Sequence, residues 1–190
     1  TPKGQSKWGV WMDLVANYWC SSSLFPKQVN QMQFLGRFFL VVALIVFLPF
    51  QALAWEARIV AVSDGDTITV EPATGGNRVK IRLHGIDAPE RKQPYGEAAR
   101  GFVFDSSLYK TVDVEELYQD RYKRTVAIIH FSNGKSLQSL LLEAGFAWVW
   151  PRYCKDCLEW ETLQKTAQKE RRGLWDSETP IPPWEWRKQH

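Results

Sequence analysis

Short apolar runs in the second part of the chain alternate with polar residues in the manner of β-strands. Residues 78–83 (RVKIRL) alternate basic and apolar positions, which is typical of a strand with one buried face. The segment Gly75-Gly76-Asn77, which precedes this run, has the composition of a hairpin turn. The predicted strands cover residues 56–62, 67–71, 78–83, 111–117 and 125–131.

Helices are predicted between and after these strands. They cover residues 95–109, 136–144 and 159–172. Gly145 and Gly173 follow the last two, and glycine is typical of the position just past a helix end. Residues 178–190, which are rich in Pro and Trp, are predicted to form an irregular strap that packs on the domain.

This order of elements favours an α+β, mainly β fold. Five short strands with interspersed helices over residues 55–190 fit an OB-fold, a five-stranded barrel with about three helices. Such barrels often bind oligonucleotides. The periodicity alone also allows another α+β arrangement.

The first 54 residues have a different pattern. Residues 38–48 are uninterrupted apolar residues, FFLVVALIVFL, and this run is shorter than the roughly 20 residues of a spanning helix. Ala52 and Ala54 follow it with the A-x-A spacing of a signal-peptidase site. We therefore predict a signal peptide over residues 32–54, preceded by an upstream or non-native extension, residues 1–31. The protein is expected to be exported, secreted or periplasmic, and to be anchored in the membrane only if the signal peptide is not cleaved.

The net positive charge of the chain comes from this first segment. It carries four basic residues and one acidic residue, so 4 − 1 accounts for the whole net charge of +3. The remaining residues contain 20 basic and 20 acidic side chains. The predicted domain is therefore not a polycation that coats nucleic acid, and an anionic ligand must be bound by local clusters of Lys and Arg. A hydrophobic content of 45% also excludes a wholly disordered chain.

Three carboxylates, Asp66, Asp87 and Glu90, stand out beside the ends of the predicted strands. They lie in the segments Asp64-Gly65-Asp66-Thr67 and Asp87-Ala88-Pro89-Glu90, with Arg82 between the two segments. Each segment alone is ordinary turn chemistry. Together they offer the oxygen ligands that a hard cation such as Ca²⁺ prefers, and the lack of nearby Cys argues against zinc. His84, alone in this region, is predicted to be structural.

A longer pattern connects these segments over residues 56–176. It reads V-S-D-G-D-T, then I-R-L-x-G-I-D-A-P-E, then Y-G-E-A-A, then D-R-Y-K-R-T, and finally G-L-W. In order and spacing this pattern resembles the staphylococcal nuclease (thermonuclease) family. The resemblance implies an exported OB-fold endonuclease that hydrolyses phosphodiester bonds of DNA or RNA with Ca²⁺ as cofactor, and it implies no stable protein partner.

The resemblance also implies roles for individual residues. Asp66, Asp87 and the Ala88 carbonyl match metal ligands; Arg82, Glu90 and Arg124 match catalytic groups; Arg121, Tyr122 and Tyr153 match substrate-binding groups. The chemistry of these side chains agrees, because a cation and two guanidinium forks can offset the charge that develops on a phosphate under attack. A carboxylate such as Glu90 can orient or deprotonate the attacking water.

Some positions depart from the family pattern. Lys123 stands where the best-known member has Gly, residues 90–95 form a shorter loop, and Pro151 replaces an aromatic residue of the nucleotide pocket. These departures leave the metal and phosphate groups intact, but because of them the resemblance does not extend to base preference, affinity or the ratio of DNA to RNA cleavage. Trp148 and Trp150 are predicted to pack in the core rather than to stack on bases.

The two cysteines of a C-x-x-C segment, Cys154 and Cys157, are candidates for a disulfide. Export would place them in an oxidising compartment, which favours the bond, and free thiols are the alternative. Two cysteines cannot form a structural zinc site alone.

A second class of function is a catalytically silent OB-fold module that binds nucleic acid. Such a module has no need for all of the proposed active-site groups together. The sequence retains Asp66, Arg82, Asp87, Glu90 and Arg124. This set favours the enzyme.

Overall fold

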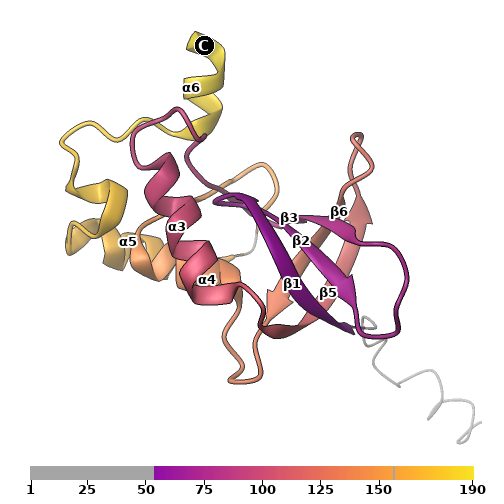
Figure 1. Ribbon diagram of the computed structural model, residues 1–190. Helices are drawn as coiled ribbons and strands as arrows, with labels where there is room; N and C mark the ends of the chain where they lie inside the picture. Colours follow the sequence, from indigo (N-terminus) through magenta and orange to yellow (C-terminus); the bar gives the residue numbers. More distant parts are fainter. Residues whose placement is uncertain (1–53, 156) are drawn as a thin grey trace, which may run out of the picture. The chain divides into compact units, whose positions relative to one another are not determined.

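Five strands close a barrel in the computed structural model, which describes residues 54–155 and 157–190 (Figure 1). The strands are β1 (Trp55–Asp64), β2 (Thr67–Pro72), β3 (Val79–Leu83), β5 (Thr111–Gln119) and β6 (Thr125–His130). They follow one another around the barrel in the order β1-β2-β3-β6-β5, and β1 pairs with β5 to close it. β3 and β6 run parallel, and the other neighbours are antiparallel. The predicted five-stranded OB-type barrel is confirmed.

Alternation along β3 decides which of its side chains enter the core. Ile81 and Leu83 are buried inside the barrel, and Ile81 lies opposite Ile68 of β2. Since successive side chains of a strand point to opposite faces, Arg82 is turned away from the core. The hydrophobic register of the barrel therefore presents the Arg82 guanidinium on the outer side of the sheet.

The helices gather beside the barrel in Figure 1. They are α3 (Gly96–Ser107), α4 (Leu137–Ala144), α5 (Leu158–Lys169) and α6 (Pro183–Gln189), with a 3₁₀ turn, η1 (Gly173–Asp176). α4 begins with a capping box in which the Ser136 hydroxyl accepts a hydrogen bond from the Ser139 N–H. It ends at Gly145, whose φ of 75° lies in the left-handed region, as the sequence predicted.

The C-terminal tail differs from the prediction. We expected residues 178–190 to form an irregular strap, but Pro183–Gln189 form α6. Pro183 stands at the start of this helix, where a fixed φ and a missing N–H are tolerated. The described part of the chain accordingly contains four α-helices rather than about three.

Two short strands were also not predicted. β4 (Ile86–Asp87) pairs antiparallel with β7 (Trp148–Val149), so that Asp87 lies opposite Trp148. Strands of two residues give no periodic signal in a sequence. Their pairing fixes Asp87 beside the segment that carries Trp150.

The predicted extension and signal peptide, residues 1–31 and 32–54, lie outside the described residues apart from Ala54. Between residues 54 and 190, leaving out residue 156, no helix is long and apolar enough to cross a bilayer.

Candidate active site

Arg82 joins two aspartates that are distant in sequence. Its Nη1 lies 2.5 Å from Asp66 Oδ2, and its Nη2 donates a hydrogen bond of 2.8 Å to Asp87 Oδ1. Asp66 follows the turn after β1, whereas Asp87 ends the short strand β4. The two outer nitrogens of one planar guanidinium can reach both carboxylates at once, which a single ammonium cannot do. Arg82 thus holds together the two predicted carboxylate segments, residues 64–67 and 87–90.

Gly65 permits the close approach of these segments. A Cβ at this position would lie 2.7 Å from Ala88 Cβ and 3.0 Å from Ala99 Cβ. The Ala88 N–H donates a hydrogen bond of 3.0 Å to Asp66 Oδ2. The glycine of the D-G-D-T turn is therefore required by packing, and the predicted metal ligands Asp66 and Ala88 are neighbours.

Burial strongly affects two of the carboxyl groups. Asp87 has no solvent-exposed surface, and this burial raises its pKa to about 6. Burial and the charge of Asp66 also raise the pKa of Asp64 to about 6. Asp64 Oδ1 is buried and has no hydrogen-bond partner among the described residues. Carboxylates in this environment bind a neighbouring cation strongly, because a positive charge favours their ionised form.

Glu90 is held at the edge of the site by its loop. Its N–H donates a hydrogen bond of 3.1 Å to Gln93 Oε1, and its carbonyl accepts one from the Gln93 N–H. The Glu90 side chain is 42% exposed, so solvent reaches the carboxylate. This exposure suits a group that contacts water, and it distinguishes Glu90 from the buried Asp87.

The C-terminal helix α6 contributes a further guanidinium to the site. Arg187 of α6 donates hydrogen bonds of 2.7 Å to Asp87 Oδ2 and to Glu90 Oε1. Burial opposes its charge, but these hydrogen bonds dominate and raise the pKa of Arg187 above its usual range. Nothing in the sequence signalled this contact, which links residues about a hundred positions apart.

The residues present fit a hard cation if a backbone carbonyl and water complete its coordination. No group of three or more His, Cys, Asp or Glu side chains within the described ranges is close enough to enclose a metal ion. Two side-chain carboxylates, Asp66 and Asp87, converge, and the Arg187 guanidinium already occupies a cationic position beside Asp87. A metal ion would therefore be held by these oxygens, completed by a backbone carbonyl such as that of Ala88 and by water, as Ca²⁺ accepts.

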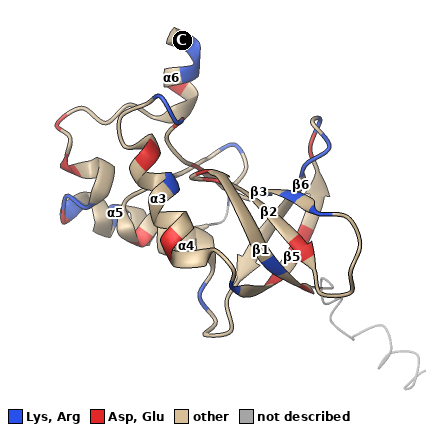
Figure 2. Cartoon of the chain, in the orientation of Figure 1, with Lys and Arg blue, Asp and Glu red and all other residues tan. Residues whose placement is uncertain are grey.

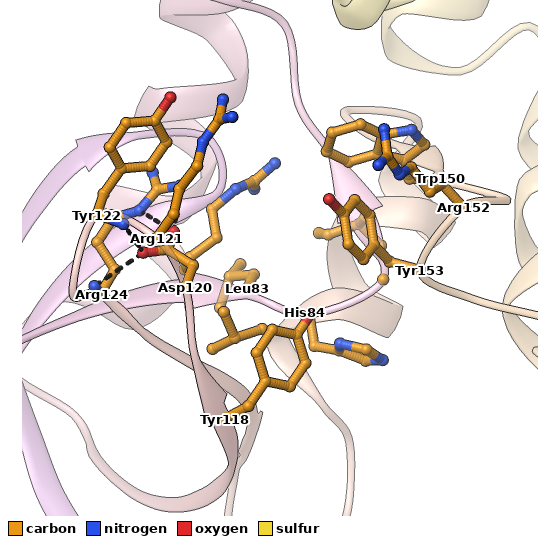
Figure 3. A pocket seen from close by; sticks show the side chains of 14 residues that line it. Leu83, His84, Tyr118, Asp120, Arg121, Tyr122, Arg124, Trp150, Arg152 and Tyr153 are labelled. Carbon is orange, nitrogen blue, oxygen red and sulfur yellow. Dashed lines mark hydrogen bonds and ion pairs between the residues drawn. The ribbon is translucent and has the colours of Figure 1, made fainter.

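A cleft of about 480 Å³ extends beside Arg82. Figure 3 shows Arg121 and Tyr122 on one side of this cleft, with Trp150 and Tyr153 on the opposite side. Tyr122 and Tyr153 are 63% and 41% exposed, so their rings are available to a ligand. The structure therefore brings the three predicted substrate-binding residues, Arg121, Tyr122 and Tyr153, to the same cleft.

Arg124 lines the cleft from the loop that joins β5 to β6, where Figure 2 shows a cluster of basic positions. Asp120 Oδ2 accepts a hydrogen bond of 2.7 Å from Arg124 Nε, and Asp120 Oδ1 caps the N–H groups of Tyr122 and Arg124. Although burial raises the pKa of Asp120, these hydrogen bonds outweigh it and hold the pKa below its usual range. Asp120 thus fixes one edge of the Arg124 guanidinium.

Lys123 has a φ of 60°, in the left-handed region that favours glycine. The departure from Gly noted in the sequence therefore places a side chain in a conformation that glycine adopts without strain. A non-glycine residue in this conformation costs about 1–2 kcal/mol. The tight turn between Asp120 and Arg124 is kept in spite of this cost.

The aromatic residues of the cleft differ in burial. Trp148 is buried and packs on Trp175 with ring centroids 5.0 Å apart, which confirms the predicted core role. Trp150 instead lines the cleft and contacts Tyr153, with centroids 4.7 Å apart. The prediction that Trp150 packs in the core was therefore wrong, because the β4–β7 pair carries it to the cleft wall.

A disulfide joins Cys154 to Cys157, with their Cα atoms 5.5 Å apart. Cys154 is buried against Gly85, where a Cβ would lie 3.0 Å from the sulfur. The bond closes the segment directly after Tyr153. It therefore restrains the chain that forms one wall of the cleft.

Several residues of the site were missed or left without a role by sequence reasoning. They are Asp64, His84, Tyr118, Asp120, Trp150 and Arg187. Asp64 and Asp120 belong to segments that were singled out, and their turn chemistry could have indicated their structural roles. His84, predicted to be structural, lines the cleft, and its ring contacts Tyr118 edge-on at 6.1 Å.

Comparison of the sequence with known proteins identifies the family of this chain. The family described as Staphylococcal nuclease homologue matches residues 80–177. A protein described as an uncharacterized endonuclease of Escherichia coli is 39% identical over 132 residues, which cover 70% of this chain and 84% of that protein. A micrococcal nuclease of Shigella flexneri is 32% identical over 160 residues, covering 77% and 88% of the two chains. The staphylococcal-like nuclease CAN1 of Arabidopsis thaliana is 41% identical over 113 residues, covering 58% of this chain and 34% of that protein. The barrel, the carboxylate and arginine cluster and these similarities together show that the chain belongs to the staphylococcal nuclease homologue family.

Proposed function

We propose that this nuclease is a Ca²⁺-dependent endonuclease that hydrolyses phosphodiester bonds of DNA or RNA in the cleft beside Arg82. The observation that carries the proposal is that one guanidinium, Arg82, binds both Asp66 and Asp87 at the wall of a cleft that Arg124 also lines. Such a site offers carboxylates for a cation and guanidinium groups for a phosphate within one surface. Export from the cell remains a prediction from the sequence.

The cleft suits a flexible nucleotide chain. Its exposed aromatic rings can stack on bases without regard to sequence, and Tyr122 already carries Arg121 over its face at 4.7 Å. Arg82 and Arg124 can donate paired hydrogen bonds to phosphate oxygens, because a guanidinium fork matches their spacing. The proposed substrate is therefore an extended, single-stranded or locally opened segment.

Asp66, Asp87 and the Ala88 carbonyl would hold the metal ion. When bound, Ca²⁺ supplies Lewis-acid stabilisation of the phosphate charge and favours deprotonation of water. Ca²⁺ accepts six to eight oxygen ligands in a flexible arrangement, whereas Mg²⁺ requires a near-octahedral site. We therefore expect Mg²⁺ to replace Ca²⁺ poorly in a site with few converging carboxylates.

The chain's own residues divide the remaining chemistry. Glu90, with its solvent-accessible carboxylate, orients the attacking water and accepts its proton. Arg82 and Arg124 stabilise the negative charge that grows on the phosphate oxygens. Asp120 keeps the Arg124 guanidinium in place, so that little reorganisation is needed when the phosphate binds.

Replacing Asp87 with Asn should abolish Ca²⁺ binding and DNA cleavage together. The variant keeps the shape of the side chain but removes the charge that is buried between Arg82 and Arg187. Isothermal titration with Ca²⁺ and cleavage of a closed-circular plasmid measure the two losses on the same preparation of the full chain.

Asp113→Asn is the matched control, because Asp113 is exposed on β5 and the change removes the same charge. It should bind Ca²⁺ and cleave like the parent. An Asp87→Asn protein that is folded and still cleaves at the parent rate would overturn the metal assignment.

A further inference from the structure

Helix α6 places a positive charge on the carboxylates that the metal ion needs. Arg187 Nη2 lies 2.7 Å from Asp87 Oδ2, and Arg187 Nη1 lies 2.7 Å from Glu90 Oε1 and 3.3 Å from Asp87 Oδ1. Asp87 has no exposed surface in this arrangement. The Arg187 side chain itself is 39% exposed, so it covers the buried carboxylate from the solvent side.

The segment that leads into α6 is anchored on the domain. Gln93 Nε2 donates a hydrogen bond of 2.6 Å to the Ile181 carbonyl. Trp184 stacks parallel to Trp150 with ring centroids 6.1 Å apart, and Arg187 lies over the Trp150 ring at 5.6 Å. The Gln93 and Trp184 contacts hold the start of the helix next to the cleft whatever Arg187 binds.

The end of α6 is attached to the domain by other contacts than the segment that leads into the helix. Lys188 pairs with Glu185 at 2.9 Å, and His190 stacks on Trp186 at 3.8 Å, so both pairs lie within the helix. Figure 2 shows the basic positions at this end of the chain. Among the ion pairs of the described residues, those of Arg187 connect this end of the helix to the barrel domain.

The charges of the site indicate that Arg187 and a divalent cation compete for Asp87. Asp66, Asp87 and Glu90 carry three negative charges, and Arg82 offsets one of them, which leaves the charge that a divalent cation neutralises. Arg187 offsets a further charge. A cation that approaches Asp87 must displace the Arg187 guanidinium from the Oδ2 atom, because two cations at that oxygen repel each other.

We propose that Arg187 is an internal cation that competes with the metal ion for Asp87, so that binding of Ca²⁺ and release of the end of α6 are coupled. This inference rests on the proposed function, because it requires a metal ion at Asp87. Coupling of this kind is reciprocal: the contact that weakens Ca²⁺ binding is itself weakened by Ca²⁺. While Arg187 binds Asp87 the end of the helix covers this carboxylate, and with Ca²⁺ bound Arg187 is free to leave it.

Calorimetric titration of the full chain with Ca²⁺ tests the first half of this coupling. Arg187→Gln should bind Ca²⁺ between about 5- and 150-fold more tightly than the parent, which is the usual range for coupled sites. Lys188→Gln removes the same charge from the adjacent position of the same helix, and it should bind Ca²⁺ with the parent affinity. Circular dichroism checks that each variant is folded.

Hydrogen exchange on the parent tests the second half without any substitution. Ca²⁺ should increase deuterium uptake in residues 187–190, because it removes the ion pairs that hold the end of the helix. Greater protection of this segment with Ca²⁺ would overturn the proposal. So would an Arg187→Gln protein with the parent affinity, and in that case Ca²⁺ binding itself, and with it the proposed function, would stand. If neither the folded parent nor the folded variant binds Ca²⁺, the proposed function and this inference both fail.

Discussion

Glu90→Gln should lower kcat by about 10²- to 10⁴-fold at saturating Ca²⁺, the usual effect of losing a general base. The amide keeps the shape of the side chain and can still hydrogen-bond, but it cannot accept a proton. The hydrogen bond that the Glu90 N–H donates to Gln93 Oε1 does not involve the Glu90 side chain and should hold the loop in place. Single-turnover cleavage of a labelled oligonucleotide measures the chemical step directly.

The outcome distinguishes three roles for Glu90. Glu71→Gln is the control, since Glu71 pairs with Arg58 and Arg78 on the barrel rather than with Arg187. A Glu90→Gln protein that binds Ca²⁺ far more weakly would make Glu90 a direct metal ligand. A variant with the parent kcat would show that the water needs no protein base, and the proposed mechanism would lose that step.

Arg82→Lys should cost about 2–4 kcal/mol of transition-state stabilisation, by analogy with a lost oxyanion-hole donor. Lysine keeps the charge, but its single ammonium cannot bridge Asp66 Oδ2 and Asp87 Oδ1 while it also presents a fork to the phosphate. The reduction in kcat/KM for plasmid or oligonucleotide cleavage measures the cost.

Arg58→Lys provides the matched control for this change. Arg58 lies on β1, is 56% exposed and pairs only weakly with Glu71 at 3.3 Å. Its replacement should leave kcat/KM and stability near the parent values, because exposed ion pairs contribute little. Equal activity of the Arg82→Lys and Arg58→Lys proteins would reduce Arg82 to a surface charge.

The barrel could be predicted because each of its strands has its own local pattern. Alternation over Val79–Leu83 placed Ile81 and Leu83 inside, and the structure agrees. α4 was also predicted from a local signal, since Gly145 marks the end of the helix. Such features depend on neighbours in sequence, which a single chain displays directly.

The C-terminal helix and its contact with Asp87 could not be predicted from the sequence. Pro183 and the tryptophans around it suggested an irregular strap, and no local signal indicated that Arg187 reaches Asp87. That contact depends on the path of the whole tail across the domain. The β4–β7 pair, which moves Trp150 into the cleft, depends on tertiary structure in the same way.

The residues of the candidate site could be predicted from the sequence, but their contacts could not. The carboxylates and arginines of the nuclease pattern were identified, and the structure joins Asp66, Arg82 and Asp87 directly. The structure also shows Glu90 bound to Arg187, a partner that the pattern does not contain. Relatives named as nucleases make the silent binding module the weaker alternative.

Cleavage of nucleic acid by this chain should depend on a metal ion at Asp87. The most direct test is a time course of closed-circular plasmid cleavage by the purified full chain with Ca²⁺, with excess chelator, and with Ca²⁺ restored after the chelator. We expect nicked and linear products with Ca²⁺, no cleavage with chelator and recovery when Ca²⁺ returns. Undiminished cleavage in excess chelator, or no cleavage under any of the three conditions, would contradict this expectation.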